Sequence, residues 1–79
     1  MYYVYVLRNQ VNFNRYIGHC ENIPARMNDH NYGKVKSTKA FKPWHMAHYE
    51  KINTRDEAIA RERFLKTGIG REWLDSQGI

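Results

Sequence analysis

Two short runs near the start of the chain, residues 2–7 and 15–20, combine aromatic with β-branched residues. Such residues favour β-strands. Each run contains a tyrosine triplet, Tyr3-Val4-Tyr5 in the first and Tyr16-Ile17-Gly18 in the second. The asparagine-rich segment between them, residues 9–14, has the composition of a turn. The sequence therefore predicts a β-hairpin that carries both triplets.

The alternation of side chains along a strand predicts which residues of this hairpin share a face. Tyr5 is expected on one face of the first strand, while Val4 and Val6 point to the other. If Ile17 packs beside the two valines, Tyr16 lies on the face of Tyr5. Aromatic residues are also ordinary strand formers, so sheet packing explains either triplet taken alone.

A helix is predicted after the hairpin, with Asn22 as its N-cap and Pro24 in its first turn. It is expected to run to about His30 and to end near residues 31–33. Arg26 and His30 are four residues apart, so they lie on consecutive turns, and the apolar stripe of the helix aims them toward the sheet.

The next segment, residues 33–43, is predicted to be a basic loop with two hydroxyl side chains and one phenylalanine. A loop of this kind suits the phosphates of a nucleic acid, although a solvated loop is the simpler interpretation for any one lysine. The candidate nucleic-acid-binding residues are Lys34, Lys36, Lys39 and Lys42.

A third strand is predicted over residues 44–51, and a short last helix is expected within residues 69–79, where Trp73 would cover the core. Strict alternation divides the third strand into two faces. One face would hold Trp44, Met46, His48 and Glu50, and the other His45, Ala47 and Tyr49.

The helix before that tail has the clearest start signal, because Thr54 and Glu57 have the spacing of a capping box. Its end is expected near Gly68. At about 100° per residue, Glu62 falls within the apolar arc of this helix. Acidic residues are rarely buried without a partner. The candidate partners are Lys66, Arg55, a core tyrosine hydroxyl and a metal ion.

Composition and charge limit the remaining possibilities. The 79 residues support one domain, residues 1–79. Thirteen basic against eight acidic residues give a net charge of +5, which favours a polyanionic partner, either nucleic acid or a membrane surface. No apolar run approaches a spanning helix, and no signal-peptide pattern is present, so we expect a cytoplasmic protein without membrane attachment. Cys20 alone predicts neither an intramolecular disulfide nor a zinc site.

Taken together, the two triplets, Arg26, His30 and Glu62 occur in an order and at intervals that resemble the GIY-YIG nuclease superfamily, in particular its small single-domain bacterial branch. Shorter phrases extend the resemblance over nearly the whole chain. Tyr3 stands where a glycine gave the family half of its name, a substitution that is common in this branch. His19-Cys20 replaces a position that relatives usually fill with a small hydroxyl-bearing residue.

The resemblance implies an α+β fold, in which a small three-stranded antiparallel sheet is flanked by helices. It also implies an enzyme that hydrolyses DNA phosphodiester bonds with one divalent cation, Mg²⁺ or Mn²⁺. It implies five catalytic residues. Tyr5 would accept the proton of the attacking water, directly or as a phenolate, and His30 would orient or deprotonate it. Arg26 would contact the scissile phosphate, and Tyr16 would bind the phosphate or position the water. Glu62 would be the metal ligand.

A domain of this size has no room for a separate DNA-recognition module. We therefore expect structure-selective or nonspecific cleavage in DNA repair or processing. A targeting protein or a homodimer would be the further partners, and the choice between DNA and RNA stays open. One alternative is a non-catalytic nucleic-acid-binding module that uses the basic loop and aromatic side chains. Another is a protein-interaction adaptor. Metal-dependent turnover separates the nuclease from both.

Overall fold

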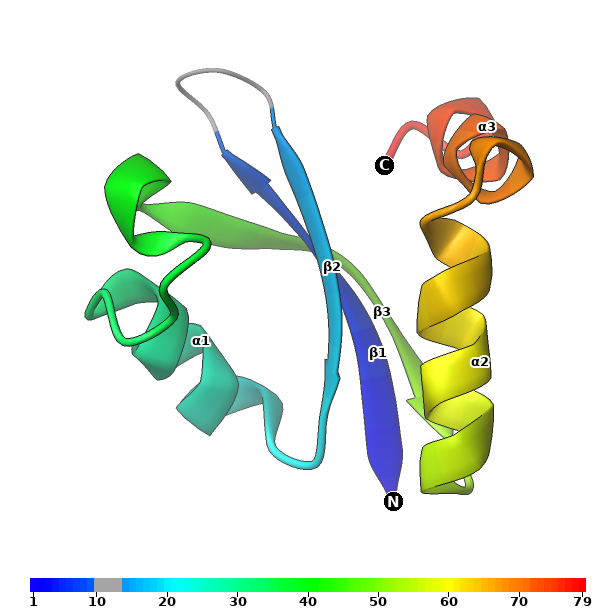
Figure 1. The fold of residues 1–79 in the computed structure, drawn as a ribbon, viewed down its shortest axis with the longest axis horizontal. Helices are drawn as coiled ribbons and strands as arrows, with labels where there is room; N and C mark the ends of the chain where they lie inside the picture. Colours follow the sequence, from blue (N-terminus) through cyan, green and yellow to red (C-terminus); the bar gives the residue numbers. More distant parts are fainter. Residues whose placement is uncertain (10–13) are drawn as a thin grey trace.

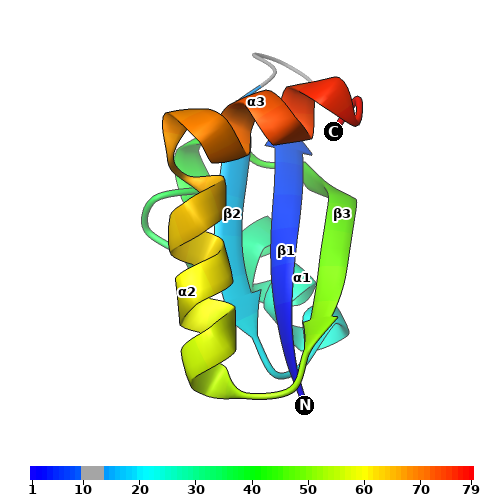
Figure 2. The same ribbon diagram turned by 90° about the vertical axis from the view of Figure 1, so that its right-hand side faces the viewer.

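The structure is a computed structural model, and it describes residues 1–9 and 14–79. Strands β1 (Tyr2–Asn9), β2 (Arg15–Cys20) and β3 (Trp44–Ile52) form an antiparallel sheet in the order β2-β1-β3. Helix α1 (Ile23–Asn31) lies on one side of the sheet, and α2 (Arg55–Leu65) and α3 (Gly68–Ser76) lie on the other (Figures 1 and 2). This arrangement confirms the α+β fold with a small three-stranded antiparallel sheet flanked by helices.

The hairpin of β1 and β2 has the predicted division of faces. Tyr5 pairs with Gly18, and it is buried with Leu7 and Trp44 on the side of α1. Val4 and Val6 pack with Ile17 on the opposite side. The predicted turn falls mainly on residues 10–13, outside the described residues, and the Asn9 N–H donates to the Asn14 carbonyl at its ends (2.9 Å).

The second core layer joins the sheet to α2 and α3. Ala58, Leu65 and Leu74 are fully buried against the valines of β1. Burying a leucine side chain contributes about 1.5–3 kcal/mol, so this layer fixes the two C-terminal helices on the sheet. Trp73 packs on the edge of the same cluster, which confirms its predicted place over the core.

Strand β3 contains an extra residue that the sequence pattern did not predict. Val6 pairs with His48 and Leu7 pairs with Met46, which leaves Ala47 as a β-bulge. A bulge places two residues opposite one and so shifts the alternation of the strand by one position. Even-numbered residues before Ala47 therefore point to one face of the sheet, and even-numbered residues after it point to the other.

The contacts of β3 follow this change of face. Met46 packs with the Tyr5 cluster on the α1 side. Glu50 instead accepts two hydrogen bonds from Arg61 of α2, at 2.8 and 3.0 Å, and the His48 ring lies 6.0 Å from the Trp73 ring. The prediction that Trp44, Met46, His48 and Glu50 share one face was therefore wrong, because it assumed an uninterrupted strand.

The helix starts follow the predicted capping residues. The Asn22 side chain accepts a hydrogen bond from the Ala25 N–H (3.0 Å), and the Thr54 hydroxyl accepts from the Glu57 N–H (3.2 Å). Helix α2 ends at Leu65, and Gly68 is the first residue of α3 rather than the stop of α2. Within the described residues, no helix combines the length and the apolar character needed to span a bilayer.

Candidate active site

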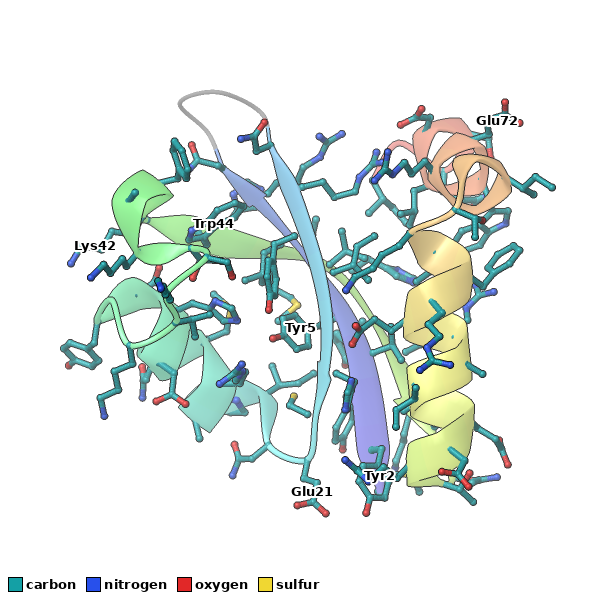
Figure 3. All side chains as sticks on the ribbon, viewed as in Figure 1. Tyr2, Tyr5, Glu21, Lys42, Trp44 and Glu72 are labelled. Carbon is teal, nitrogen blue, oxygen red and sulfur yellow. The ribbon has the colours of Figure 1, made fainter. Side chains whose placement is uncertain are left out.

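The hydroxyl of Tyr5 is the centre of a buried polar network between the sheet and α1. Tyr5 is 1% exposed and His30 is fully buried. The Tyr5 Oη lies 2.9 Å from His30 Nε2, and Arg26 Nε donates to the same oxygen at 3.4 Å. Tyr5 lies on the α1 side of β2 (Figure 3). As the sequence predicted, the helix places Arg26 and His30 side by side over the tyrosine face of the hairpin.

A second buried hydroxyl defines the tautomer of His30. Thr38 is fully buried, and its Oγ1 donates to the Val35 carbonyl (3.3 Å) while lying 2.8 Å from His30 Nδ1. We assign the single proton of the Thr38 hydroxyl to the Val35 carbonyl, and with this assignment Thr38 Oγ1 accepts from an Nδ1–H of His30. His30 Nε2 is then the unprotonated nitrogen and accepts from the Tyr5 hydroxyl. The network thus runs from Arg26 through Tyr5 and His30 to Thr38.

Thr38 was not among the predicted site residues. The sequence grouped its hydroxyl with the phosphate-binding loop, whereas the structure buries it beneath Trp44, whose Nε1–H donates to the Thr38 carbonyl (2.9 Å). The signal that could have identified it is a small hydroxyl residue within reach of the predicted helix that carries His30.

The environment determines the protonation states of the two central groups. Burial raises the pKa of Tyr5 from its ordinary value of 10.0 to about 12, and this effect outweighs the opposing hydrogen bond from Arg26. Burial, together with the positive charge of Arg26, lowers the pKa of His30. At neutral pH the pair is a phenol beside a neutral imidazole. A standing phenolate, one of the two roles considered for Tyr5, is therefore disfavoured here.

Tyr16 completes the aromatic wall of the network. Its ring centroid lies 4.9 Å from that of His30 and 6.2 Å from that of Tyr5. A Cβ added at Gly18 would lie 2.7 Å from the Tyr5 Oη and 3.1 Å from Tyr16 Cε1. Only glycine lets β2 pass this close to both phenol rings. The structure therefore brings Tyr5, Tyr16, Arg26 and His30 together.

Glu62 lies on α2, on the opposite side of the sheet from this cluster. Its Oε1 is 2.6 Å from His19 Nδ1, and its Oε2 accepts from Lys66 Nζ at 2.8 Å. Burial by itself raises the pKa of Glu62, but the hydrogen bonds of Lys66 and His19 lower it below its ordinary value. Lys66 is thus the partner among those proposed from the sequence, and His19 is a partner that the sequence did not suggest.

The carboxylate of Glu62 is a suitable ligand for a hard divalent cation, because such cations prefer oxygen ligands. The Glu62 side chain is ionised at neutral pH and 18% exposed, so its oxygens are accessible to water and to a hydrated cation. Among residues 1–9 and 14–79, no group of three or more histidine, cysteine, aspartate and glutamate side chains could surround a metal. Mg²⁺ accepts such a sparse site, because it binds through one or two carboxylates and completes its shell with water and substrate phosphate.

The four candidate nucleic-acid-binding lysines lie on the segment that follows α1. This segment includes a 3₁₀ helix, Lys39–Phe41, where the sequence predicted only loop. Lys34 Nζ lies 3.9 Å from the Asp29 carboxylate. Lys42 points away from the sheet (Figure 3). All four are exposed on the α1 side of the molecule, where a strand of nucleic acid could reach them: Lys34, Lys36, Lys39 and Lys42.

Comparison with known proteins matches residues 1–71 to the family model described as the GIY-YIG catalytic domain. A UPF0213 protein of Staphylococcus haemolyticus is 36% identical over 67 residues, which cover 84% of this chain and 80% of the relative. UPF0213 proteins of Staphylococcus aureus are 38% identical over 53 residues. That match covers 66% of this chain and 65% of the length of the S. aureus relatives. No solved structure gives a significant match.

Proposed function

Because the chain belongs to the GIY-YIG family, we propose that it is an endonuclease that hydrolyses phosphodiester bonds of DNA with a divalent cation. The observation that carries this proposal is the buried chain of hydrogen bonds from Tyr5 through His30 to Thr38, with Arg26 beside it. We take residues 1–79 to form one nuclease domain. Its catalytic residues are Tyr5, Tyr16, Arg26, His30 and Glu62.

The neutral pair of Tyr5 and His30 supports a proton relay. As a water molecule attacks the phosphorus, the Tyr5 oxygen accepts the proton of the water while its own proton passes to His30 Nε2. No free phenolate forms, so the raised pKa of Tyr5 does not prevent the step. Thr38 keeps Nε2 aimed at Tyr5, because it holds the Nδ1–H of the same ring.

Arg26 and Tyr16 are the proposed contacts of the scissile phosphate. Arg26 uses only Nε on Tyr5, and its Nη1 lies 3.7 Å from Asp29 Oδ2, beyond hydrogen-bond distance, so the two Nη groups are suited to the oxygens on which charge builds during attack. Its side chain is 37% exposed, which allows this contact. Tyr16, which is half-buried and whose ring lies beside those of Tyr5 and His30, would position the water or bind the phosphate.

Glu62 is the proposed ligand of the cation, Mg²⁺ or Mn²⁺. When bound there, the cation would neutralise charge on the phosphate and stabilise the leaving oxygen. The hydrogen bonds of Lys66 and His19 favour the ionised carboxylate. When the cation binds, it would replace them as the partner of the carboxylate oxygens. Since one protein carboxylate binds Mg²⁺ weakly, the substrate phosphate would complete the site.

The substrate is proposed to be DNA cut nonspecifically or by structure, in repair or processing. The basic charge and the exposed lysines after α1 give affinity for the backbone but offer no reading of base sequence. A targeting protein or a second copy of the chain would supply further selectivity.

The test is cleavage of labelled duplex, single-stranded, flap and four-way-junction DNA with Mg²⁺ or Mn²⁺. Tyr5→Phe is expected to lose about 10²–10⁴-fold in rate, the usual contribution of a proton-transfer group. Tyr49→Phe removes the same hydroxyl from a tyrosine that is 57% exposed, and it should cut like the native protein. Glu62→Gln should lose the response to metal. Salt-sensitive binding without any cutting would instead identify a binding module.

A further inference from the structure

A pocket of about 430 Å³ lies at the edge of the sheet, outside the hydrogen-bonded network of Tyr5. Its lining residues come from β2, the C-cap of α2, and α3: Arg15, Tyr16, Ile17, Lys66 and Arg71. Since β2 is an edge strand, and Tyr16 and Ile17 point to opposite faces, the pocket wraps around that edge. Figure 1 shows β2 between α1 on one side and α2 with α3 on the other.

Three of the five lining side chains are cationic, and they differ in how firmly they are held. Arg15 is 13% exposed, and its Nη2 donates to Asp75 Oδ1 (2.7 Å) and to the Ile79 carbonyl (2.6 Å). It forms a fixed wall. Lys66 shares its charge with Glu62. Arg71 is exposed and free to turn its planar fork toward an anion in the pocket.

The pocket also adjoins both parts of the proposed active site. Tyr16 lines it and contacts the His30 ring. Lys66 lines it and binds Glu62. An extended strand whose scissile phosphate lies between Tyr5 and Glu62 therefore passes this pocket as it leaves the site. Ile17 and the Tyr16 ring offer apolar contact to a sugar between two phosphates.

From this geometry we propose that the pocket binds a backbone phosphate of the substrate strand, adjacent to the phosphate that is cut. The inference rests on the proposed nuclease function and adds a second phosphate position to it. Arg71 makes the principal contact, with Lys66 as a second cation and Arg15 as a fixed positive wall. Arginine suits this role because its fork can bind two phosphate oxygens at once.

The test measures binding without cleavage. A fluorescent single-stranded oligonucleotide is titrated with the protein in EDTA at 50–200 mM salt, and the slope of log K against log salt is compared. This slope is negative, and loss of one phosphate contact makes it less negative by about 0.7 for a single strand. For Arg71→Gln, the affinity deficit relative to native protein should therefore shrink about 2.6-fold between 50 and 200 mM salt. Arg71→Lys, which retains the charge, should keep most of the native slope.

Arg55→Gln is the matched control, because Arg55 is an exposed arginine in the first turn of α2 and does not line the pocket. It makes the same change in net charge, and its slope should equal the native one. An unchanged slope for Arg71→Gln, or an equal decrease for both variants, would overturn the proposal. Both side chains are exposed, so melting temperatures should match native protein and exclude unfolding as the cause.

Two further outcomes separate this inference from the nuclease proposal. If the protein binds the strand through Arg71 but never cuts with Mg²⁺ or Mn²⁺, the pocket is supported and the nuclease function fails. If it cuts DNA while the Arg71→Gln slope stays native, the pocket alone fails. Direct binding of inorganic phosphate at millimolar concentration that is lost in Arg71→Gln, without any Arg71-dependent strand binding, would assign the pocket to a free anion and overturn the strand proposal.

Discussion

Ionisation of the Tyr5 hydroxyl tests the relay directly, because the relay requires a neutral phenol. The environment raises the pKa of Tyr5 from 10.0 to about 12, chiefly through burial. In the unfolded chain the same hydroxyl ionises near its ordinary value. Between these two values the unfolded state has lost the proton and the folded state retains it. Tyr5 therefore contributes stability that is fully present below pH 10 and is lost as the pH rises toward 12.

The magnitude follows from the shift of about two units, each worth about 1.36 kcal/mol. The whole contribution is about 2.7 kcal/mol, and about half of it, roughly 1.3 kcal/mol, is lost between pH 9 and pH 11. Urea unfolding at these two pH values should show this loss in native protein. Tyr5→Phe has no ionisable group at this position, so its stability should fall by about 1.3 kcal/mol less over the same interval.

Ultraviolet absorbance gives an independent measure of the same ionisation. The chain has six tyrosines, so the titration of native protein minus that of Tyr5→Phe isolates the contribution of Tyr5. This difference should appear with a midpoint about two units above pH 10, if the fold persists. A component that titrates at or below pH 10 would refute the reasoning, because burial would then not favour the neutral phenol over the phenolate at this position.

Three other perturbations bear on the same network. Thr38→Val leaves the buried Nδ1–H of His30 without an acceptor, so urea unfolding should show a loss of about 1–3 kcal/mol, and Thr38→Ser should restore most of it. Gly18→Ala puts a Cβ 2.7 Å from the Tyr5 hydroxyl, so cleavage assays should show a loss of rate close to that of Tyr5→Phe. The lowered pKa of His30 makes the native fold lose stability as pH falls below 6.5, and His30→Gln should show less of this loss in urea unfolding at pH 7.5 and 5.

Local patterns were sufficient to predict the parts of the fold that depend on neighbouring residues. The alternation of β1 separates Tyr5 from Val4 and Val6, and the capping residues Asn22 and Thr54 mark the starts of α1 and α2. Such features depend on period and on side chains three or four residues away, so the sequence contains them directly.

The missed features depend on contacts that no local pattern contains. His30 meets Thr38 eight residues later through the path of an irregular segment, and Glu62 meets His19 across 43 residues. Helical periodicity correctly indicated that Glu62 needs a partner, but it could suggest partners only on its own helix or in general terms. The raised pKa of Tyr5 was missed for a related reason. The sequence predicted the charge of Arg26 nearby, whereas burial, the larger effect, depends on the packed fold.

The bulge at Ala47 determines which residues of β3 join each of the two core layers. If Ala47 instead paired opposite Leu7 in a regular ladder, residues 44–46 would have to turn over relative to the rest of the strand. Trp44 would leave the Tyr5 cluster, and its hydrogen bond to the Thr38 carbonyl would be lost. A shift of one residue in the pairing of this edge strand would thereby dismantle the support of His30, although no residue of the proposed catalytic set would change.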